Sequence, residues 1–287
     1  MTKDEISTTL YVTDLDGTLL GDNSELSVES VNLLNQAISL GANITVATAR
    51  TPATVSQLLK GVEMKLPAIV MTGAALWDMS TQKYENVEFL PPPIVEKLRE
   101  IYCKESLPVF IYTLQNEKIE ILHIGPLSES EKSFINERAK SPFKHFNAPC
   151  DNEMVEDLKN VMLFYAMQPT DDVERTYNRI KNIKEVIPVY YHDIFGPETG
   201  ILEVFSNKVS KASAIQYLVR RHNFSRVVVF GDNINDLPMM RSATHSVAVG
   251  NAIEDVRNAA DEVIGKNSDD AVAKWILEDT KRMVFQK

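Results

Sequence analysis

Residues 10–18 read LYVTDLDGT, a short run of strand-forming residues that ends abruptly in an acidic, polar loop. This pattern predicts a buried β-strand followed directly by a turn. Asp14 and Asp16 lie two positions apart at the carboxyl end of the predicted strand. Both side chains can therefore project toward the crevice where open α/β sheets bind ligands.

The chain around this strand alternates between strands and helices. Ser27 is a plausible N-cap for a helix that ends near Gly41, and Thr51-Pro52 opens a second helix with proline at its first position. Strongly apolar runs return in the last third of the chain. This alternation predicts an α/β fold with a Rossmann-like, doubly wound parallel sheet. The expected strands are residues 10–13, 43–48, 68–71, 226–231, 246–250 and 262–264.

The middle of the chain follows a different pattern. Two adjacent β runs, residues 109–114 and 118–124, predict antiparallel pairing, and an α+β order continues after them. We expect an inserted α+β domain at residues 83–199, with a core domain formed by residues 1–82 and 200–287. The other elements expected in the middle are helices at 94–105, 129–140 and 171–183 and strands at 161–167, 189–194 and 201–205.

Composition narrows the class of protein. The 287 residues are 44 % apolar and 24 % charged, which is typical of a soluble globular chain, and no apolar run is long enough for a membrane helix. Residues 1–5 are polar and lack the features of a signal peptide, which predicts a cytoplasmic protein. In that compartment Cys103 and Cys150 are expected to stay reduced. A formal net charge of -10 disfavours nucleic acid as a partner, and the sequence leaves the oligomeric state open.

The close acidic pair near the start predicts a cation site. Carboxylates as close as those of Asp14 and Asp16 repel each other, so the pair needs a proton or a cation. Hard oxygen ligands of this kind favour Mg²⁺, which binds few protein carboxylates and keeps several waters. An EF-hand calcium loop is excluded, because Thr18 and Leu19 stand where it uses a ligand and a glycine. An aspartate-rich turn without a ligand is the alternative.

A second acidic cluster follows another strong strand, where residues 231–236 read GDNIND. Asp232 and Asp236 are expected at the same edge of the sheet as Asp14, because the carboxyl ends of parallel strands meet there. Asn235 or Asp236 could instead cap the helix that follows.

Two further positions could face an anion. Thr48 ends the second strand just before a helix, where a hydroxyl and backbone N–H groups form a natural anion site. Lys211 stands in the first turn of a helix, where its charge opposes the helix dipole and needs an offsetting partner. A bound phosphate would supply that partner, and a salt bridge to a carboxylate or simple solvation is the alternative.

In their order along the chain, these four pieces resemble the motifs of the haloacid dehalogenase superfamily. They are residues 14–18 (DLDGT), Thr48, Lys211 and residues 231–236. The domain inserted between Thr48 and Lys211 looks most like that of the Cof-type branch, type IIB with a C2 cap. The resemblance covers essentially the whole chain, and residues 247–252 (VAVGNA) also look typical of this branch.

The resemblance implies a role for each candidate site residue. Asp14 is then the nucleophile that forms an aspartyl-phosphate, and Asp16 is the general acid–base. Magnesium is bound by Asp14, the backbone carbonyl of Asp16 and Asp232. Asp236 stands close to the metal, with a place in its outer shell. The residues that hold the phosphoryl oxygens are Thr48, Lys211 and Asn235.

Two residues depart from the usual pattern of this branch. Ala49 stands where many relatives have glycine, and Thr72 stands where asparagine is common. Neither change removes a group that the chemistry requires, so the departures bear on substrate identity more than on mechanism.

The function that the resemblance implies is magnesium-dependent hydrolysis of a small soluble phosphomonoester. A sugar phosphate comes first, followed by a nucleotide such as flavin mononucleotide, or pyridoxal phosphate, and a large inserted cap favours such small substrates. One alternative is a phosphomutase of the same superfamily, which passes the phosphoryl group back to a sugar. Another is a non-catalytic sensor of a phosphorylated metabolite, against which the intact pair Asp14 and Asp16 argues.

Overall fold

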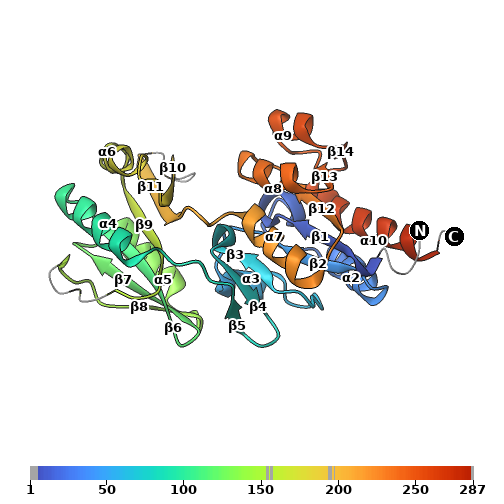
Figure 1. Cartoon of the computed structure of the whole chain (residues 1–287), viewed down its shortest axis with the longest axis horizontal. Coiled ribbons are helices and arrows are strands. Elements are labelled where there is room, and N and C mark those ends of the chain that lie inside the picture. The colour runs from blue at the N-terminus through green and yellow to red at the C-terminus, as the bar shows by residue number, and fades with distance from the viewer. Residues whose placement is uncertain (1–5, 153–154, 156–157, 193–195, 197, 286–287) are drawn as a thin grey trace. The chain divides into compact units, whose positions relative to one another are not determined.

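The computed structural model describes residues 6–152, 155, 158–192, 196 and 198–285, and the chain divides into two compact units. The core unit comprises the residues up to 86 and those from 210 onward, and the second unit comprises residues 87–209. Figure 1 draws the core unit in blue to teal and in orange to red, and the second unit mainly in green and yellow. The sequence-based boundaries lay at 82/83 and 199/200.

The core unit is built on a sheet with the strand order β14-β13-β12-β1-β2, in which every pairing is parallel. Strand β1 pairs with β12 on one side and β2 on the other, so it is buried along its whole length. Parallel strands with helices between them confirm the predicted α/β class (Figure 1). The strands are β1 (Thr9–Thr13), β2 (Asn43–Val46), β12 (Arg226–Gly231), β13 (His245–Ala248) and β14 (Glu262–Val263).

Helices of the core unit begin where capping residues were expected. The Ser27 hydroxyl accepts a hydrogen bond from the Ser30 backbone N–H at 2.8 Å and so caps α2. Pro52 stands at the first position of α3, where its missing N–H costs nothing. Within the described ranges, no helix has the length and apolar character needed to span a membrane. The helices are α2 (Val28–Ser39), α3 (Pro52–Leu58), α7 (Lys211–His222), α8 (Leu237–Ser242), α9 (Glu254–Ala259) and α10 (Ala271–Phe285).

A small antiparallel sheet extends this core and was not predicted beyond its first strand. Strand β3 (Ala68–Val70) continues the parallel sheet through a bridge between Ala47 and Ile69. It then pairs with β4 (Ala75–Asp78), which pairs with β5 (Lys83–Glu85). Because β5 hydrogen bonds to β4, the core unit runs past residue 82.

The second unit is built on a separate sheet with the order β10-β11-β9-β6-β7-β8. Strands β6 and β7 pair antiparallel, as predicted from the two adjacent β runs. The strand expected at 189–194 is β10, which begins at Val186 and is seen to His192, and Ile194 lies outside the described residues. The strands are β6 (Val109–Gln115), β7 (Lys118–Ile124), β8 (Lys144–Phe146), β9 (Val161–Pro169), β10 (Val186–His192) and β11 (Thr199–Ser206), and the helices are α4 (Pro92–Lys104), α5 (Glu129–Arg138) and α6 (Thr170–Ile180).

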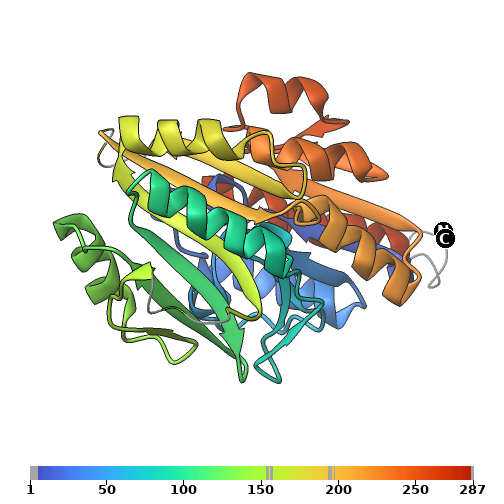
Figure 2. The same ribbon diagram turned by 60° about the vertical axis from the view of Figure 1, so that its left-hand side comes forward.

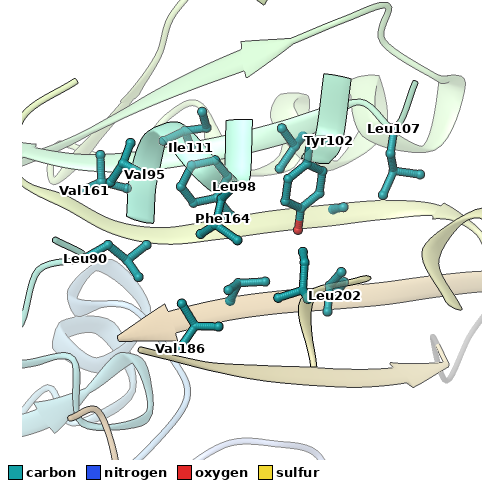
Figure 3. Packing of buried hydrophobic residues seen from close by; sticks show 14 of the residues in the cluster. Leu90, Val95, Leu98, Tyr102, Leu107, Ile111, Val161, Phe164, Val186 and Leu202 are labelled. Carbon is teal, nitrogen blue, oxygen red and sulfur yellow. The ribbon is translucent and has the colours of Figure 1, made fainter. Parts of the chain in front are cut away.

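Helices α4 and α6 lie along one face of this sheet, as Figure 2 shows. Figure 3 shows Val95, Leu98 and Tyr102 of α4 pointing toward Phe164 of β9. The rings of Tyr102 and Phe164 stack with their centroids 5.7 Å apart. These side chains belong to a hydrophobic core within the second unit. Full burial of each apolar side chain contributes about 1.5–3 kcal/mol to stability.

A carboxyl group in the middle of the second sheet is expected to make stability depend on pH. Glu203 of β11 lies opposite Tyr165 on one side and Val189 on the other, and burial raises its pKa to about 7. Between pH 4.5 and about 7, the folded state therefore keeps a proton on Glu203 that the unfolded chain, with an ordinary glutamate pKa, has lost. The stability that this proton provides is complete below the unfolded pKa and disappears as the pH rises through about 7.

Glu203→Gln is thus expected to raise the free energy of unfolding by about 1–2 kcal/mol at pH 8 and to change it little at pH 5. Thermal melts of both proteins at the two pH values measure this difference. The matched control is Glu185→Gln, since Glu185 is exposed in the same unit. An equal effect of Glu203→Gln at both pH values would contradict the interpretation.

Candidate active site

The loop that follows β1 and carries Asp14 leaves the sheet at the same edge as the loop that follows β12 and carries Asp232. Asp14 follows β1 directly, and its backbone N–H donates to the Phe230 carbonyl of β12 at 3.0 Å. Thr13 and Phe230 are register partners in the parallel pair, so Asp14 and Asp232 emerge at the same edge. The structure thus brings together the two acidic motifs that the sequence places more than 200 residues apart, and it buries the Asp14 side chain.

Lys211 is the first residue of α7 and is 3 % exposed. Its ammonium donates to Asp14 Oδ1 at 2.6 Å and to Asp236 Oδ1 at 2.7 Å. Burial lowers the pKa of Lys211, but the two carboxylates raise it by more, so the net shift is upward and the ammonium stays charged. The salt bridge considered as an alternative for this residue is therefore present, and it offsets the unfavourable helix dipole.

Asp236 closes the loop after β12. It ends the single turn η4 (Ile234–Asp236) and is fully buried. Its Oδ2 accepts hydrogen bonds from the backbone N–H groups of Asp232 at 3.1 Å and Asn233 at 3.2 Å, while its Oδ1 holds Lys211. Asp236 therefore caps the loop and orients the lysine, but its side chain does not cap α8. Asn235 lies in the same turn and is exposed.

Three carboxylates at this edge of the sheet are placed to bind a divalent cation. Asp14, Asp232 and Asp236 each offer an oxygen, and these atoms lie within 4.8 Å of one another. Burial raises the pKa of Asp14 to about 7 and also raises the pKa of Asp232, since charged carboxylates are poorly solvated there. The Thr18 hydroxyl donates to Asp232 Oδ1 at 3.0 Å and fixes that side chain. Two buried carboxylates and one half-buried carboxylate, opposed by a single ammonium, fit the Mg²⁺ that the sequence predicts.

Asp16 points elsewhere and has a different partner. The Arg50 Nε donates to Asp16 Oδ2 at 2.7 Å and the Arg50 Nη2 to Asp16 Oδ1 at 2.5 Å. The side chain of Asp16 is 49 % exposed and is not one of the three clustered carboxylates. Gly17, next in the chain, has φ +74°, and a Cβ there would lie 2.5 Å from Asp232 Oδ2. Glycine at this position therefore lets the two motifs approach closely.

Thr48 lies buried between β2 and α3. Its Oγ1 accepts a hydrogen bond from the Arg50 backbone N–H at 3.1 Å, which leaves the hydroxyl proton available to an anion. Its own backbone N–H donates to the Ile69 carbonyl at 3.0 Å. Its backbone thus holds the residue in place, and its hydroxyl can still donate one hydrogen bond.

Asn251 has a structural role at the site that sequence reasoning did not assign. Its Nδ2 donates to the Gly17 carbonyl at 2.7 Å, and its Oδ1 accepts from the Asn267 N–H at 3.0 Å. Asn267 in turn donates through Nδ2 to the Leu20 carbonyl at 2.8 Å. The loop with the first acidic pair is therefore tied to the C-terminal part of the core unit. The available signal was the segment VAVGNA at 247–252.

Comparison with known proteins identifies the family. The family model described as haloacid dehalogenase-like hydrolase matches residues 11–276. The chain belongs to this family. The match confirms the superfamily that the motifs resemble.

The relatives of this haloacid dehalogenase-like hydrolase carry phosphatase names. The chain is 24 % identical to 5-amino-6-(5-phospho-D-ribitylamino)uracil phosphatase YcsE of Bacillus subtilis, covering 96 % of this chain and 98 % of that protein. It is also 24 % identical to pyridoxal phosphate phosphatase YbhA of Escherichia coli, over 94 % of this chain and 98 % of that one. The solved structure of the subclass IIB sugar phosphatase BT4131 is similar in fold, with a TM-score of 0.70, 21 % identity and coverage of 95 % and 99 %.

Thr72 of this haloacid dehalogenase-like hydrolase lies in a turn whose backbone is unusual for threonine. Met71, Thr72 and Gly73 have φ values of +50°, +59° and +98°. Their turn supports the Thr48 loop, because the Met71 N–H donates to the Arg50 carbonyl and the Thr72 N–H to the Thr48 carbonyl. Asparagine tolerates a left-handed conformation, whereas a β-branched side chain is strained in it. The backbone at position 72 therefore favours asparagine over threonine.

Thr72→Asn is expected to raise the free energy of unfolding by about 0.5–1.5 kcal/mol, because it removes part of this strain. For a chain of this size, that shift raises the melting temperature by a few degrees at most. The matched control is Thr51→Asn, since Thr51 has φ -81° and both residue types serve at a helix N-cap. A melting temperature that falls in Thr72→Asn would show that the threonine makes a contact worth more than the strain.

Proposed function

We propose that this haloacid dehalogenase-like phosphatase is magnesium-dependent and hydrolyses a small soluble phosphomonoester through an aspartyl-phosphate on Asp14. The observation that supports this most strongly is the position of Asp14. Its carboxylate is buried against the Lys211 ammonium at 2.6 Å and beside the carboxylates of Asp232 and Asp236. This position thus combines a carboxylate that can attack phosphorus, the fixed positive charge of Lys211 and ligands for a metal ion.

In the proposed reaction, an Asp14 oxygen attacks phosphorus, forming a new oxygen–phosphorus bond as the bond to the ester oxygen breaks. Asp16 donates its proton to the departing alkoxide. In the second half, Asp16 takes a proton from water, whose oxygen attacks phosphorus and releases inorganic phosphate and the free Asp14 carboxylate. The proton that Asp16 takes up then serves the next turnover.

The other candidate residues stabilise the charge on the transferring group. Lys211, already held by two carboxylates, and the hydroxyl of Thr48 donate to phosphoryl oxygens, and the exposed Asn235 is a third donor. Removal of one such donor costs about 3–4 kcal/mol in well-studied sites. Magnesium, when bound, supplies positive charge that offsets the carboxylates and the phosphoryl group. The groups proposed to hold it are Asp14, Asp232 and the backbone carbonyl of Asp16, with Asp236 close by.

We favour a sugar phosphate as substrate, in a cytoplasmic enzyme. We also propose that the second unit is the cap, which restricts the site to small molecules. The relatives named above act on a ribitylamino-uracil phosphate, pyridoxal phosphate or a sugar phosphate. All three are small phosphorylated metabolites, which supports the substrate class. Phosphoryl transfer back to a sugar, as in a mutase, is the alternative that uses the same residues.

Hydrolysis of p-nitrophenyl phosphate with magnesium, and with excess chelator, tests the proposal. We expect phosphate release that requires magnesium and returns when magnesium is restored. A panel of sugar phosphates, flavin mononucleotide and pyridoxal phosphate then identifies the substrate. Turnover of a sugar phosphate only after addition of a bisphosphorylated sugar would indicate a mutase. No release from any ester would favour a non-catalytic sensor.

A further inference from the structure

We propose that Arg50 is the positioning residue for Asp16: it holds the carboxyl group in one orientation, away from the three-carboxylate cluster and available to the leaving group. This inference rests on the proposed function, in which Asp16 is the general acid–base. No role follows for Arg50 from the sequence, where it is only the last residue of Thr48-Ala49-Arg50. In the folded chain, however, its guanidinium contacts Asp16 directly.

The geometry of the pair is that of a strong ionic hydrogen bond. Two nitrogens of Arg50 donate in parallel to the two oxygens of Asp16, at 2.7 and 2.5 Å. Such a fork fixes the plane of the carboxylate as well as its distance, which a lysine ammonium cannot do. A fixed orientation of the carboxyl group is what a proton donor needs, since proton transfer depends on a well-aligned approach.

Surface ion pairs usually contribute little, because two long side chains lose freedom when they meet. The backbones on both sides of this pair are held by hydrogen bonds of their own. The Arg50 N–H donates to Thr48 Oγ1 at 3.1 Å, and the Arg50 carbonyl accepts from the Met71 N–H at 3.0 Å. On the other side, Asn251 holds the carbonyl of Gly17, the neighbour of Asp16, at 2.7 Å. Only the two side chains remain to be ordered when the guanidinium meets the carboxylate.

Electrostatics explain why Asp16 needs such a partner. Asp16 precedes Gly17, where a Cβ would lie 2.5 Å from Asp232 Oδ2, so Asp16 stands next to the cluster. Without Arg50, a cation bound by the cluster would attract the Asp16 side chain as a further ligand. The guanidinium competes with such a cation for the Asp16 carboxylate and keeps this carboxylate apart from the three-carboxylate cluster. When one Asp16 oxygen carries the proton, the other can keep its hydrogen bond to Arg50, so the carboxyl group does not swing away.

Leaving-group dependence distinguishes this role from phosphate binding. General acid catalysis matters greatly for an alkyl phosphate, whose alkoxide must be protonated, and little for p-nitrophenyl phosphate, whose phenolate leaves readily. The experiment measures kcat/KM with magnesium for both esters in wild type, Arg50→Ala, Arg50→Lys and Asp16→Ala, and in the double variant. The parameter kcat/KM is chosen because it reports the first phosphoryl transfer, not the hydrolysis of the intermediate.

We expect Arg50→Ala to lower kcat/KM for the alkyl ester by about 10- to 100-fold, and for the aryl ester by less than about 3-fold. Arg50→Lys should fall between wild type and Arg50→Ala, because it keeps the charge and loses the fork. In the Asp16→Ala background, removal of Arg50 should cost nothing further, since the guanidinium acts through that carboxyl group. Arg221→Ala is the matched control, because Arg221 is an exposed guanidinium of the same unit that pairs with Glu85.

Equal losses for both esters, or a full additional loss in the Asp16→Ala background, would overturn the inference and assign Arg50 to phosphoryl binding. Thermal melts establish that each variant is folded, and the conservative Arg50→Lys keeps the test decisive if Arg50→Ala does not fold. Wild type that releases no phosphate from either ester would instead refute the proposed function on which the inference rests. The two failures are therefore distinguished by the wild-type measurement alone.

Discussion

Asp14→Asn is expected to lower magnesium-dependent kcat/KM for p-nitrophenyl phosphate by at least about 10⁴-fold, since loss of a covalent nucleophile has effects of that order. The carboxamide has nearly the shape of the carboxylate but lacks a nucleophilic oxygen with a full negative charge. Its oxygen can still accept the hydrogen bond that Lys211 donates to Asp14 Oδ1 at 2.6 Å. The variant should therefore fold, and its loss of rate should come from the missing nucleophile and metal ligand.

The covalent step can be checked apart from the rate. Wild type quenched in acid during turnover should carry one phosphoryl group on the peptide that contains residue 14, and Asp14→Asn should carry none. Asp22→Asn is the control, since Asp22 lies shortly after Asp14 in the sequence but outside the three-carboxylate cluster. Activity of Asp14→Asn within about 10-fold of wild type would reject a nucleophilic role for this residue.

The strand-end acidic residues could be predicted because one physical rule places them. A buried parallel strand exposes its side chains at its carboxyl end, and β1 and β12 each run directly into an aspartate. The register of Thr13 with Phe230 then makes Asp14 and Asp232 neighbours. The expected sheet followed from the same apolar runs, so this part of the fold and of the candidate site was accessible from sequence.

Residues that act through partners distant in sequence could not be predicted in this way. Arg50 faces Asp16 because turns at residues 71–73 hold the Thr48 loop, and no periodicity in the sequence encodes that contact. Asn251 reaches Gly17 across more than 200 positions. The ion pairs of Lys211 were foreseen only as one alternative, since an unfavourable helix dipole shows that a partner is needed but not which one.

The small sheet after β3 was missed for a related reason. Strand β4, Ala75–Asp78, is short and follows a turn with three positive φ values, so neither its length nor its flanks signal a strand. It forms because it pairs with β3 and β5. Such pairing is a property of the folded chain that local propensity does not contain.

Lys211→Met is expected to destabilise the core unit strongly and to do so in a pH-dependent manner. In wild type, the ammonium lies 2.6 Å from Asp14 Oδ1 and 2.7 Å from Asp236 Oδ1, with only 3 % of the side chain exposed. Removal of one member of a buried ion pair costs about 3–5 kcal/mol, because the remaining charges are left without a partner. Here two carboxylates are left facing each other, so a loss in that range is expected at neutral pH and above.

The sign of the pH dependence follows from Asp14. Burial raises its pKa to about 7 even with the ammonium beside it, and loss of that ammonium moves the pKa further up. In the variant, the folded state therefore binds a proton on Asp14 that the unfolded chain releases at much lower pH. That proton removes one of the two unpaired charges, so the deficit relative to wild type should be small at pH 5 and large at pH 8.

Urea unfolding of wild type and Lys211→Met in excess chelator, at pH 5 and at pH 8, measures the two deficits. Lys274→Met is the control for loss of an exposed lysine in the same unit, since Lys274 donates to the Asp269 backbone carbonyl. Magnesium at pH 8 should stabilise Lys211→Met more than wild type, because a divalent cation can replace the missing charge at the carboxylates. Equal deficits at the two pH values would show that Lys211 stabilises the core through the packing of its methylene groups and not through its charge.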